Sequence, residues 1–501
     1  MRLIPRTTSA FFIGVAGMTG PAMAETSVEA LEDRVKRLEQ IIQAAGLSVP
    51  ADDKPQAGSR RGMPDTANAA SIAANSDSSS DAQVEPPRAD FSQEPVAEEL
   101  LSDESPDDAD MGVVASEKAA IEDNPLEFSI GNHTTADIGG YVKVNYMYSD
   151  FSTGQSGDRQ RELYTPSRVN VGDAPGSDAT DFSARWTRVN LLTNTQLGDH
   201  EIEGYIEFDF FGEDASEGTV GGYGMRLRDA TFELDNTWLF GQTDSTIMDT
   251  GAWPETLDQI GPAESIINIR QTQVRYSKNG FSVALENPSV NEEFFDRDRS
   301  SSTTTLQSGD WPELIGAYRW EQDWGHIGAG ALLRQVSNEG VDDPRTGDPY
   351  ADDAALGYGL RLSGRYKVGD RGDDLRFYST YGDGMGRYVA LGLIPAGTID
   401  DRGQVKTVSY ASGYLAYKHV WTPKWRSNVV LGTLQVDNNG VSNFGPRDAA
   451  TKSASSFHIN LIWNPITPLS FGGEYIYAER EVESGADGNL DKVQFSAKYA
   501  F

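Results

Sequence analysis

Apolar and polar residues alternate along most of the chain after about residue 138. In GYVKVNYMYSD, Val142, Val144 and Tyr146 share one parity, whereas Lys143 and Asn145 take the other. A period of two places successive side chains on opposite faces of a β-strand, so each such stretch predicts a strand between two different surroundings. After the amino-terminal region the sequence has no run of about eighteen apolar residues, which a transmembrane helix would require. The pattern therefore predicts strands.

About sixteen segments of this kind follow one another, and the connections between them alternate in length. Short connections include LGDH, SKNG and WTP. Long connections centre on residues 152–181, 212–224, 247–266, 288–311, 337–355, 383–404, 437–454 and 479–491. Seven short turns and eight long loops are what an even-stranded antiparallel barrel with two unlike ends requires.

The face opposite the apolar one carries charges at the centres of the strands. In HEIEGYIEFDFF, Ile206 and Phe208 oppose Glu207 and Asp209. A soluble β-sandwich, the alternative, would bury such carboxylates at a high cost in free energy. A closed sixteen-stranded barrel has a wet lumen for charges, an outer face for lipid and no unpaired sheet edge. We therefore predict an all-β fold, a 16-stranded antiparallel transmembrane β-barrel over residues 125–501.

Tryptophans flank the short connections of the predicted barrel. Tryptophan and tyrosine prefer the interface between membrane and water, so a row of them marks one rim of a membrane barrel. These positions therefore predict an aromatic girdle at the short-turn end, the alternative being unrelated packing aromatics. The tryptophans concerned are Trp320, Trp324, Trp421, Trp425 and Trp463.

The first 24 residues have the organisation of a secretory signal peptide. Arg2 and Arg6 precede the apolar stretch AFFIGVAGM, and Ala22 and Ala24 offer small residues at a cleavage point. We expect cleavage after Ala24 and an exported protein; a buried first helix is the alternative.

Residues 25–47 carry a short heptad repeat, in which Val28, Leu31, Val35 and Leu38 follow one another at spacings of three and four. This pattern predicts a short coiled-coil segment, or alternatively an isolated amphipathic helix. Residues 48–124 are rich in Ser, Ala, Pro, Asp and Glu with almost no periodic apolar positions, which predicts a disordered, low-complexity linker.

The charge of the chain excludes some functions. A formal net charge of -34 argues against nucleic acid as a partner, because phosphates require clustered Lys and Arg. There is no cysteine, and no HExxH, GxSxG or EF-hand motif. We therefore expect no enzyme, no cofactor and no metal site, and we keep a barrel phospholipase with His419 or His458 as base as a minor alternative. The acidic long loops suggest contact with lipopolysaccharide through bridging divalent cations.

Three stretches resemble a known family. LFGQTDSTIMDTGAWPETLDQIGP, INIRQTQVRYSKNGFSVALENP and YIEFDFFG are similar to the DcaP-like trimeric outer-membrane porins, and the order of parts agrees over most of residues 25–501. In this chain Asp244 follows GQT where an aromatic residue is expected. The resemblance implies a sixteen-stranded porin, three copies per assembly, and passage of small anionic solutes such as dicarboxylates.

Basic residues of lumen parity are the candidates for selecting such solutes. A ring of Arg or Lys favours anions, and a guanidinium binds a carboxylate in a bidentate pair. In MRLRDATFEL, however, the face of two of these arginines continues into Phe232, so either a β-bulge intervenes or the assigned face is wrong. Acids of the same parity leave open that the charges merely line a wet wall. The candidate pore-lining residues are Lys143, Arg188, Arg226, Arg228, Arg275, Arg334, Arg361 and Arg365.

The third long loop is the candidate constriction. Its apolar residues, among them Ile247 and Met248, are too many for a loop lying freely in water. We predict that it folds into the barrel, where its acids face the wall arginines; packing on a neighbouring subunit is the alternative. The constriction residues are Asp249, Trp253, Glu255 and Asp258.

The chain ends in VQFSAKYAF, in which Val493, Phe495, Tyr499 and Phe501 form an apolar stripe and Lys498 points to the lumen. We expect this closing strand to be read by the barrel insertion machinery. The overall prediction is a homotrimeric porin in the outer membrane of a Gram-negative bacterium, with its amino-terminal segment in the periplasm. A structural tether or adhesin with a plugged barrel is the alternative.

Overall fold

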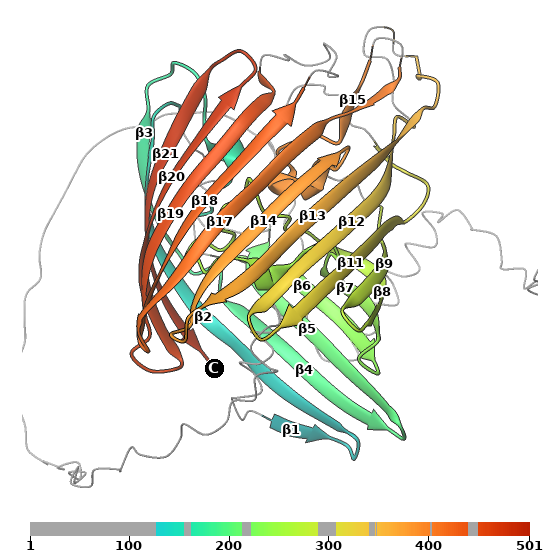
Figure 1. Cartoon of the computed structure of the whole chain (residues 1–501), viewed down its shortest axis with the longest axis vertical. Coiled ribbons are helices and arrows are strands. Elements are labelled where there is room, and N and C mark those ends of the chain that lie inside the picture. The colour runs from blue at the N-terminus through green and yellow to red at the C-terminus, as the bar shows by residue number, and fades with distance from the viewer. Residues whose placement is uncertain are drawn as a thin grey trace, which may run out of the picture. The chain divides into compact units, whose positions relative to one another are not determined.

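The computed structural model describes residues 127–154, 162–212, 222–288, 307–339, 346, 348–400, 403–438 and 449–501. The predicted signal peptide, coiled-coil segment and linker lie outside the described residues. Within the described ranges, sixteen antiparallel strands form a closed barrel (Figure 1). The barrel closes where β2 (Thr134–Phe151) pairs with β21 (Asp487–Ala500). The described part of the chain contains no helix with the length and apolar character of a membrane span.

The strands follow the predicted up-and-down order. One barrel strand is divided into β3 (Ser177–Ser183) and β4 (Arg188–Leu197), and short strands β1 (Glu127–Ile130) and β10 (Gln307–Ser308) extend the sheet at two places. A separate hairpin consists of β15 (Gly397–Ile399) and β16 (Val405–Thr407). The other barrel strands are β5 (His200–Gly212), β6 (Gly224–Leu234), β7 (Trp238–Asp244), β8 (Arg270–Lys278), β9 (Phe281–Glu286), β11 (Glu313–Gln322), β12 (Gly325–Ser337), β13 (Ala354–Val368), β14 (Asp373–Asp383), β17 (Ser409–Thr422), β18 (Trp425–Asp437), β19 (Thr451–Trp463) and β20 (Leu469–Val482).

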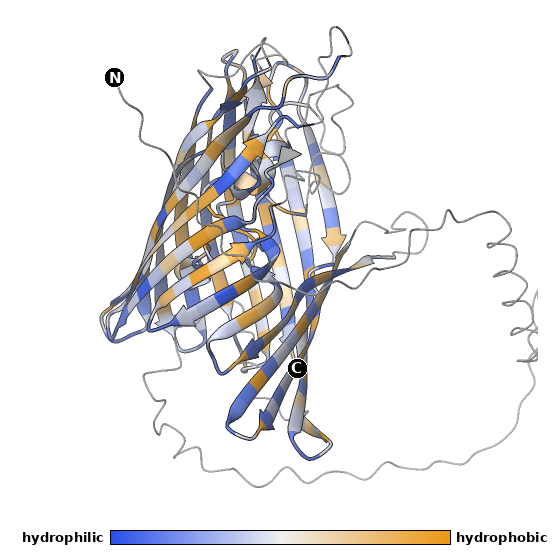
Figure 2. Cartoon of the chain, turned by 90° about the vertical axis from the view of Figure 1, so that its right-hand side faces the viewer, coloured by the Kyte–Doolittle hydropathy of each residue, from blue (hydrophilic) through white to orange (hydrophobic). Residues whose placement is uncertain are grey.

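The two faces of the wall have the predicted character, as the alternating colours of the strands in Figure 2 indicate. Val142 is 44% exposed on the outside, whereas its neighbour Lys143 is 7% exposed inside. On β5, Ile206 faces outward while Glu207 and Asp209 are buried. Apolar residues therefore meet the membrane and charged residues meet the interior.

A β-bulge on β6 resolves the ambiguous face of MRLRDATFEL. Asp229 lies opposite Glu207, but Leu227 lies opposite the next residue, Phe208, so Arg228 has no partner in the register. The extra residue changes the parity of the strand. Arg228 thus faces the lumen while Phe232 is exposed on the outside.

Two sequence-based boundaries differ from the structure. Residues 182–196, which the alternation predicts to be one strand, are interrupted between β3 and β4. There the Phe210 N–H donates to the Arg185 carbonyl at 3.1 Å, and both Arg185 and Trp186 are buried. The predicted eighth long loop, 479–491, is wrong, because β20 and β21 pair up to Glu481 and Asp487 and form a hairpin. Two-residue alternation continues through that region, but the outer positions are occupied by polar residues such as Glu479, Glu481 and Asp491, so the strands were not recognised.

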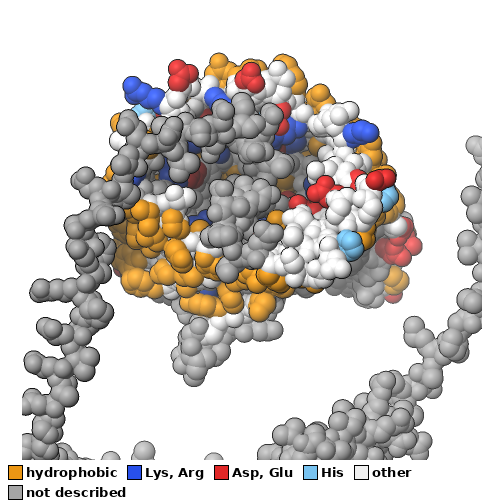
Figure 3. Space-filling model, turned by 90° about the horizontal axis from the view of Figure 1, so that it is seen from below, with side chains coloured by type: hydrophobic (Ala, Val, Ile, Leu, Met, Phe, Trp, Pro, Cys, Tyr) orange, Lys and Arg blue, Asp and Glu red, His pale blue; other side chains and the backbone are white. Residues whose placement is uncertain are grey.

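The tryptophans at the short turns lie on the outside. Trp320, Trp421, Trp425 and Trp463 are all exposed, and the rings of Trp425 and Trp463 stack at 5.6 Å between centroids. Figure 3 views the short-turn end, where hydrophobic side chains gather along part of the rim. This arrangement agrees with the predicted girdle.

Three connections fill much of the lumen. We call residues 162–176 loop L1, residues 245–269 loop L3 and residues 384–396 loop L6; L1 contains the 3-10 turn η2 (Pro166–Arg168), L3 contains η3 (Thr250–Ala252), and L6 contains η4 (Gly386–Tyr388) and η5 (Ala390–Gly392). Ile247 of L3 and Val389 of L6 share one buried cluster with wall residues such as Tyr414. The interior therefore has a packed core on one side.

Candidate functional site

L3 is anchored to the barrel wall through Asp249. Its Oδ1 accepts a hydrogen bond from Arg319 Nη1 at 3.0 Å, and its Oδ2 accepts from Arg361 Nη1 at 3.1 Å and pairs with His326 Nε2 at 3.0 Å. Burial raises the pKa of Asp249, but the hydrogen bond from His326 and the charges of Arg361 and Arg319 outweigh it and hold the pKa below its usual range. The carboxylate is thus ionised and fixed.

Two further acids of L3 are also bound by bases of the wall. Glu255 Oε2 accepts from Arg426 Nε at 2.7 Å, and Asp258 Oδ2 accepts from Lys492 Nζ at 2.9 Å. Asp258 also accepts the backbone N–H of Tyr164 in L1 at 2.8 Å. L3 therefore lies inside its own barrel, with these three acids on wall bases.

A cavity of about 670 Å³ remains beside L3. Its lining runs from L3 and L6 to Asn464, Thr467 and Pro468 of the turn between β19 and β20. It also includes Phe501 at the end of the chain. The remaining open part of the lumen thus reaches the short-turn end of the barrel.

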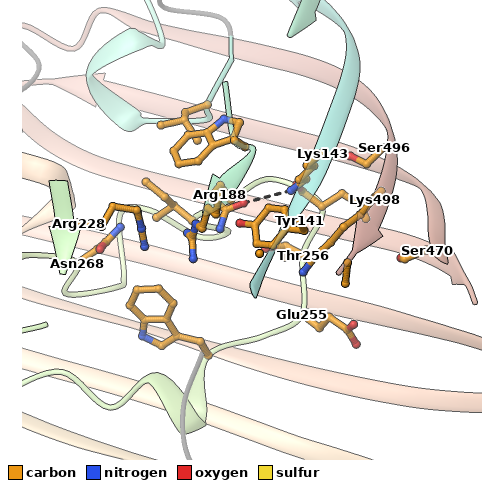
Figure 4. Close-up of a pocket in the computed structure, with 18 of the residues that line it drawn as sticks. Tyr141, Lys143, Arg188, Arg228, Glu255, Thr256, Asn268, Ser470, Ser496 and Lys498 are labelled. Carbon is orange, nitrogen blue, oxygen red and sulfur yellow. Dashed lines mark hydrogen bonds between the residues drawn. The ribbon is translucent and has the colours of Figure 1, made fainter. Parts of the chain in front are cut away.

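The lining of this cavity is strongly basic. Among the described residues, eight basic and two acidic side chains contribute to it, and several project into it in Figure 4. The acids are Asp244 and Glu255. The bases are Lys143, Arg188, Arg226, Arg228, Arg270, Arg387, Arg426 and Lys498.

The carboxylates that balance these arginines lie behind them in the wall. Arg226 Nε donates to Asp209 Oδ1 at 2.9 Å, Arg228 Nη1 donates to Asp209 Oδ2 at 3.2 Å, and Arg188 lies 3.5 Å from Glu207. Asp209 and Glu207 are at most 1% exposed. A guanidinium has five N–H donors in a fixed plane, so it can bond to more than one group at a time. The acids are thus hidden and the bases line the cavity.

Two lysines, on the neighbouring strands β2 and β21, contact neutral groups. Lys143 Nζ donates to the Leu257 carbonyl at 2.8 Å and to Gln259 Oε1 at 3.2 Å. Lys498 Nζ lies 4.0 Å from the centroid of the Tyr141 ring. Their charges are positioned by L3 and by an aromatic face.

Comparison with known proteins agrees with this architecture. A family model described as DcaP outer membrane protein matches residues 169–501. The chain belongs to the DcaP outer membrane protein family. The family and the barrel together indicate a protein of the Gram-negative outer membrane. Among curated proteins, no sequence relative was found.

Solved structures were also matched, and the first of them shares the fold. The crystal structure of the outer membrane channel DcaP of Acinetobacter baumannii is 22% identical, with a TM-score of 0.61, and the match covers 75% of this chain and 99% of that chain. The anion-selective porin from Comamonas acidovorans is 12% identical, with a TM-score of 0.45, over 74% of this chain and 100% of that one. The trimer form of OmpT from Vibrio cholerae is also 12% identical, with a TM-score of 0.42, and the match covers 74% and 100%.

The predicted pore-lining residues of this family member separate into two groups. Lys143, Arg188, Arg226 and Arg228 line the cavity. The other four bind the wall or the loops. Arg275 Nη2 donates to the Asp244 carbonyl at 2.6 Å, and Arg365 Nε donates to Asp374 Oδ2 at 3.1 Å. Arg334 Nη1 donates to the Met385 carbonyl of L6 at 2.7 Å, and Arg361 donates to Asp249 of L3. Of the predicted constriction residues, Trp253 and Glu255 line the cavity, whereas Asp249 and Asp258 anchor L3.

Four lining bases were not among the predicted pore residues. Arg270 and Arg426 lie at the beginning of their strands, where too few residues alternate to assign a face. Lys498 lies on the lumen face of the closing strand. Arg387 comes from L6 and pairs with Glu313 at 2.9 Å. The stretch GMGRYVALGLIPA of L6 is as apolar as L3. The criterion that predicted an inward L3 would therefore have predicted an inward L6.

Proposed function

We propose that the chain is an outer-membrane porin through which small anionic solutes, including dicarboxylates, diffuse by way of the basic cavity. The observation that carries this proposal is the excess of bases in the lining, with the balancing acids buried behind the arginines. The sign of the charge at the narrow part of a pore determines which ions enter it readily. The cavity therefore attracts anions and repels cations.

The arrangement of the bases fits a solute with two negative groups. Figure 4 shows Arg228 across the view from Lys143 and Lys498, which come from the neighbouring strands β2 and β21. A dicarboxylate has one group for the arginine side and one for the lysine side. Every base of the lining already has a partner or a fixed position, so a bound solute replaces existing weak contacts of the bases. The affinity of the cavity for the solute therefore stays modest, and the solute can leave.

The proposal includes the setting of the molecule. Short turns face the periplasm and long loops face outward, so the amino-terminal segment before β1 lies in the periplasm. The functional unit is a homotrimer, the acidic outer loops contact lipopolysaccharide, and the strand that ends at Phe501 is recognised by the insertion machinery.

Channel recording tests the proposed function. Purified protein in a planar bilayer under a KCl gradient should conduct and give a reversal potential on the anion side. The double variant Lys143→Gln with Lys498→Gln should reduce the anion-to-cation permeability ratio by at least about twofold. Lys424→Gln, at an exposed position in a short turn, is the matched control and should behave as the unmodified protein. A cation-selective or non-conducting protein would contradict the proposal.

A further inference from the structure

We propose that Leu391 of L6 determines which anions pass, because it forms an apolar constriction with Leu163 of L1 and Ile260 of L3. The inference rests on the proposed function, since it assigns a size-selecting element to the same pathway. The constriction lies between the basic cavity and the long-loop end of the barrel. Solutes are therefore selected twice, by charge at the bases and by size and hydration at Leu391.

L6 extends into the lumen between two packed clusters. It connects β14 to β17 at their long-loop ends, and its residues Val389 and Ala390 belong to the first cluster, which contains Tyr414 of β17. The next residue, Leu391, packs instead against a second buried cluster, which contains residues of L1 and L3. Two adjacent side chains thus contact two separate clusters, and this part of L6 lies between them.

The second cluster lies at the end of the cavity that is nearer to the long loops. It includes Phe151, the last residue of β2, where the chain leaves the wall for the first long connection. The cavity also reaches Gly140, near the short-turn end of the same strand. Leu163 and Ile260 belong to the second cluster, and both line the cavity together with Leu391. These three side chains therefore bound the cavity toward the long-loop end.

The backbone of L6 holds Leu391 in a conformation that leucine rarely adopts. The φ angles of Ala390 and Leu391 are 47° and 58°, in the left-handed region where a Cβ crowds the following carbonyl oxygen. Residues other than glycine persist there only where their surroundings compensate the strain. The packing of Leu391 against the second cluster supplies this compensation. The fold therefore specifies the position of this side chain against the preference of its backbone.

An apolar constriction selects solutes by size and hydration. The side chains of Leu163, Ile260 and Leu391 have no polar atom that could replace the water around an ion, and hydrophobic constrictions in channels resist wetting. Leu163 is 2% exposed and Ile260 is 7% exposed, so the contact between the loops leaves little room for water. A strongly hydrated or bulky anion must shed water before it reaches the bases. A compact or partly apolar anion therefore passes more readily.

Single-channel recording of the full-length protein tests the inference. Leu391→Ala and Leu391→Gly should each raise the conductance in KCl, and each should raise the gluconate-to-chloride permeability ratio by about twofold, because the constriction becomes wider. Leu391→Phe should lower both quantities. Glycine accepts a φ of 58° without strain, so Leu391→Gly gives a readout even if Leu391→Ala fails to fold. The folded band on unheated gels establishes that each variant is assembled.

Leu393→Ala is the matched control for a general loosening of L6. Leu393 lies two residues further along the same loop, is 7% exposed and belongs to the first cluster. The same truncation there removes packing without widening the constriction, so the conductance and the permeability ratio should stay near those of the unmodified protein. An equal rise of both quantities in Leu393→Ala would overturn the inference. It would also be overturned if the folded variants at Leu391 all behaved as the unmodified protein.

Anion preference separates this inference from the proposed function. The variants at Leu391 retain every base of the cavity, so their reversal potential in a KCl gradient should stay on the anion side. An unmodified protein that prefers anions, with variants at Leu391 that change nothing, would remove only this inference. Cation selectivity or absence of conductance in the unmodified protein would remove the proposed function and this inference with it.

Discussion

Asp249 of L3 and Arg361 of β13 meet inside the barrel with 3.1 Å between Oδ2 and Nη1, and both side chains are at least 94% buried. Arg361 has the parity of a pore-lining base, yet its guanidinium holds a loop. Removing one partner of such a buried ion pair destabilises the fold, because the other charge is then left buried without compensation.

We expect Asp249→Ala to loosen L3 and destabilise the barrel. The substitution leaves Arg361 buried without its carboxylate, and breaking a buried pair costs about 3–5 kcal/mol. Arg361→Gln should have a smaller effect, because Asp249 keeps Arg319 and His326. The measurements are the temperature at which the folded band is lost on unheated gels and the current noise of single channels. Asp370→Ala, in an exposed turn, is the control. If Asp249→Ala lost its folded band at the same temperature as Asp370→Ala, the anchoring role of Asp249 would be contradicted.

Glu264 of L3 should make the stability of the barrel fall as the pH rises. It is 1% exposed, and burial raises its pKa, an effect only partly opposed by the hydrogen bond from Ser456 Oγ at 2.7 Å. A raised pKa in the folded state gives stability that is fully present below the unfolded value of about 4.3 and is lost as the pH rises through the folded pKa.

Glu264→Gln mimics the protonated form and tests this sign. The variant should unfold at a higher temperature than the unmodified protein at pH 8, and the difference should vanish at pH 4. Glu339→Gln, at an exposed position, should show no such pH-dependent difference. A variant that is less stable at pH 8 would show that the ionised carboxylate is required.

Arg387→Gln should weaken anion preference without unfolding the barrel. The guanidinium reaches the cavity from L6 and pairs with Glu313, which retains its contact with Arg334 Nε at 2.9 Å when Arg387 is removed. We expect the anion-to-cation permeability ratio to fall, as measured by reversal potential. Arg371→Gln, in an exposed turn, removes the same charge outside the cavity and should leave the ratio unchanged.

Deletion of Phe501 should impair assembly. Its backbone N–H and carbonyl both bond to Gly140, at 3.0 Å each, so the deletion removes the last rung of the pairing that closes the barrel. Membrane insertion of the variant, followed as folded protein in outer-membrane fractions, should decrease. Ile466→Ala, an exposed apolar position in a neighbouring turn, is the control for lost hydrophobic surface. Normal assembly of the deletion would contradict the expectation.

The sequence was sufficient to predict which residues face lipid and which face the lumen. The prediction needs only the two-residue period of a β-strand, and it holds wherever the pairing between strands is regular, as at Val142 and Lys143. It was ambiguous where the register changes, because a β-bulge such as that at Arg228 adds a residue without any distinctive sequence. The interruption after Ser183 escaped prediction for the same reason.

The identity of the cavity bases could not be predicted from parity. Lys143 and Arg361 both face inward, but L3 leaves one beside the open space and covers the other. Which bases remain accessible depends on the paths of L3 and L6 through the lumen. Those paths follow from contacts between residues far apart in the sequence, such as Arg334 with Met385, and no local pattern encodes them.

Lys492 implies an order of events during assembly. Its Nζ donates to Asp258 of L3 at 2.9 Å and to the Glu162 carbonyl of L1 at 3.3 Å, and it belongs to the final strand of the chain. L1 and L3 are synthesised long before that strand, and other contacts hold them without it, such as those of Asp249 with Arg319 and Arg361. The contact that ties both loops to the wall at one side chain, however, forms only when β21 is in place. The arrangement of L1 and L3 is therefore completed only after the barrel wall has closed.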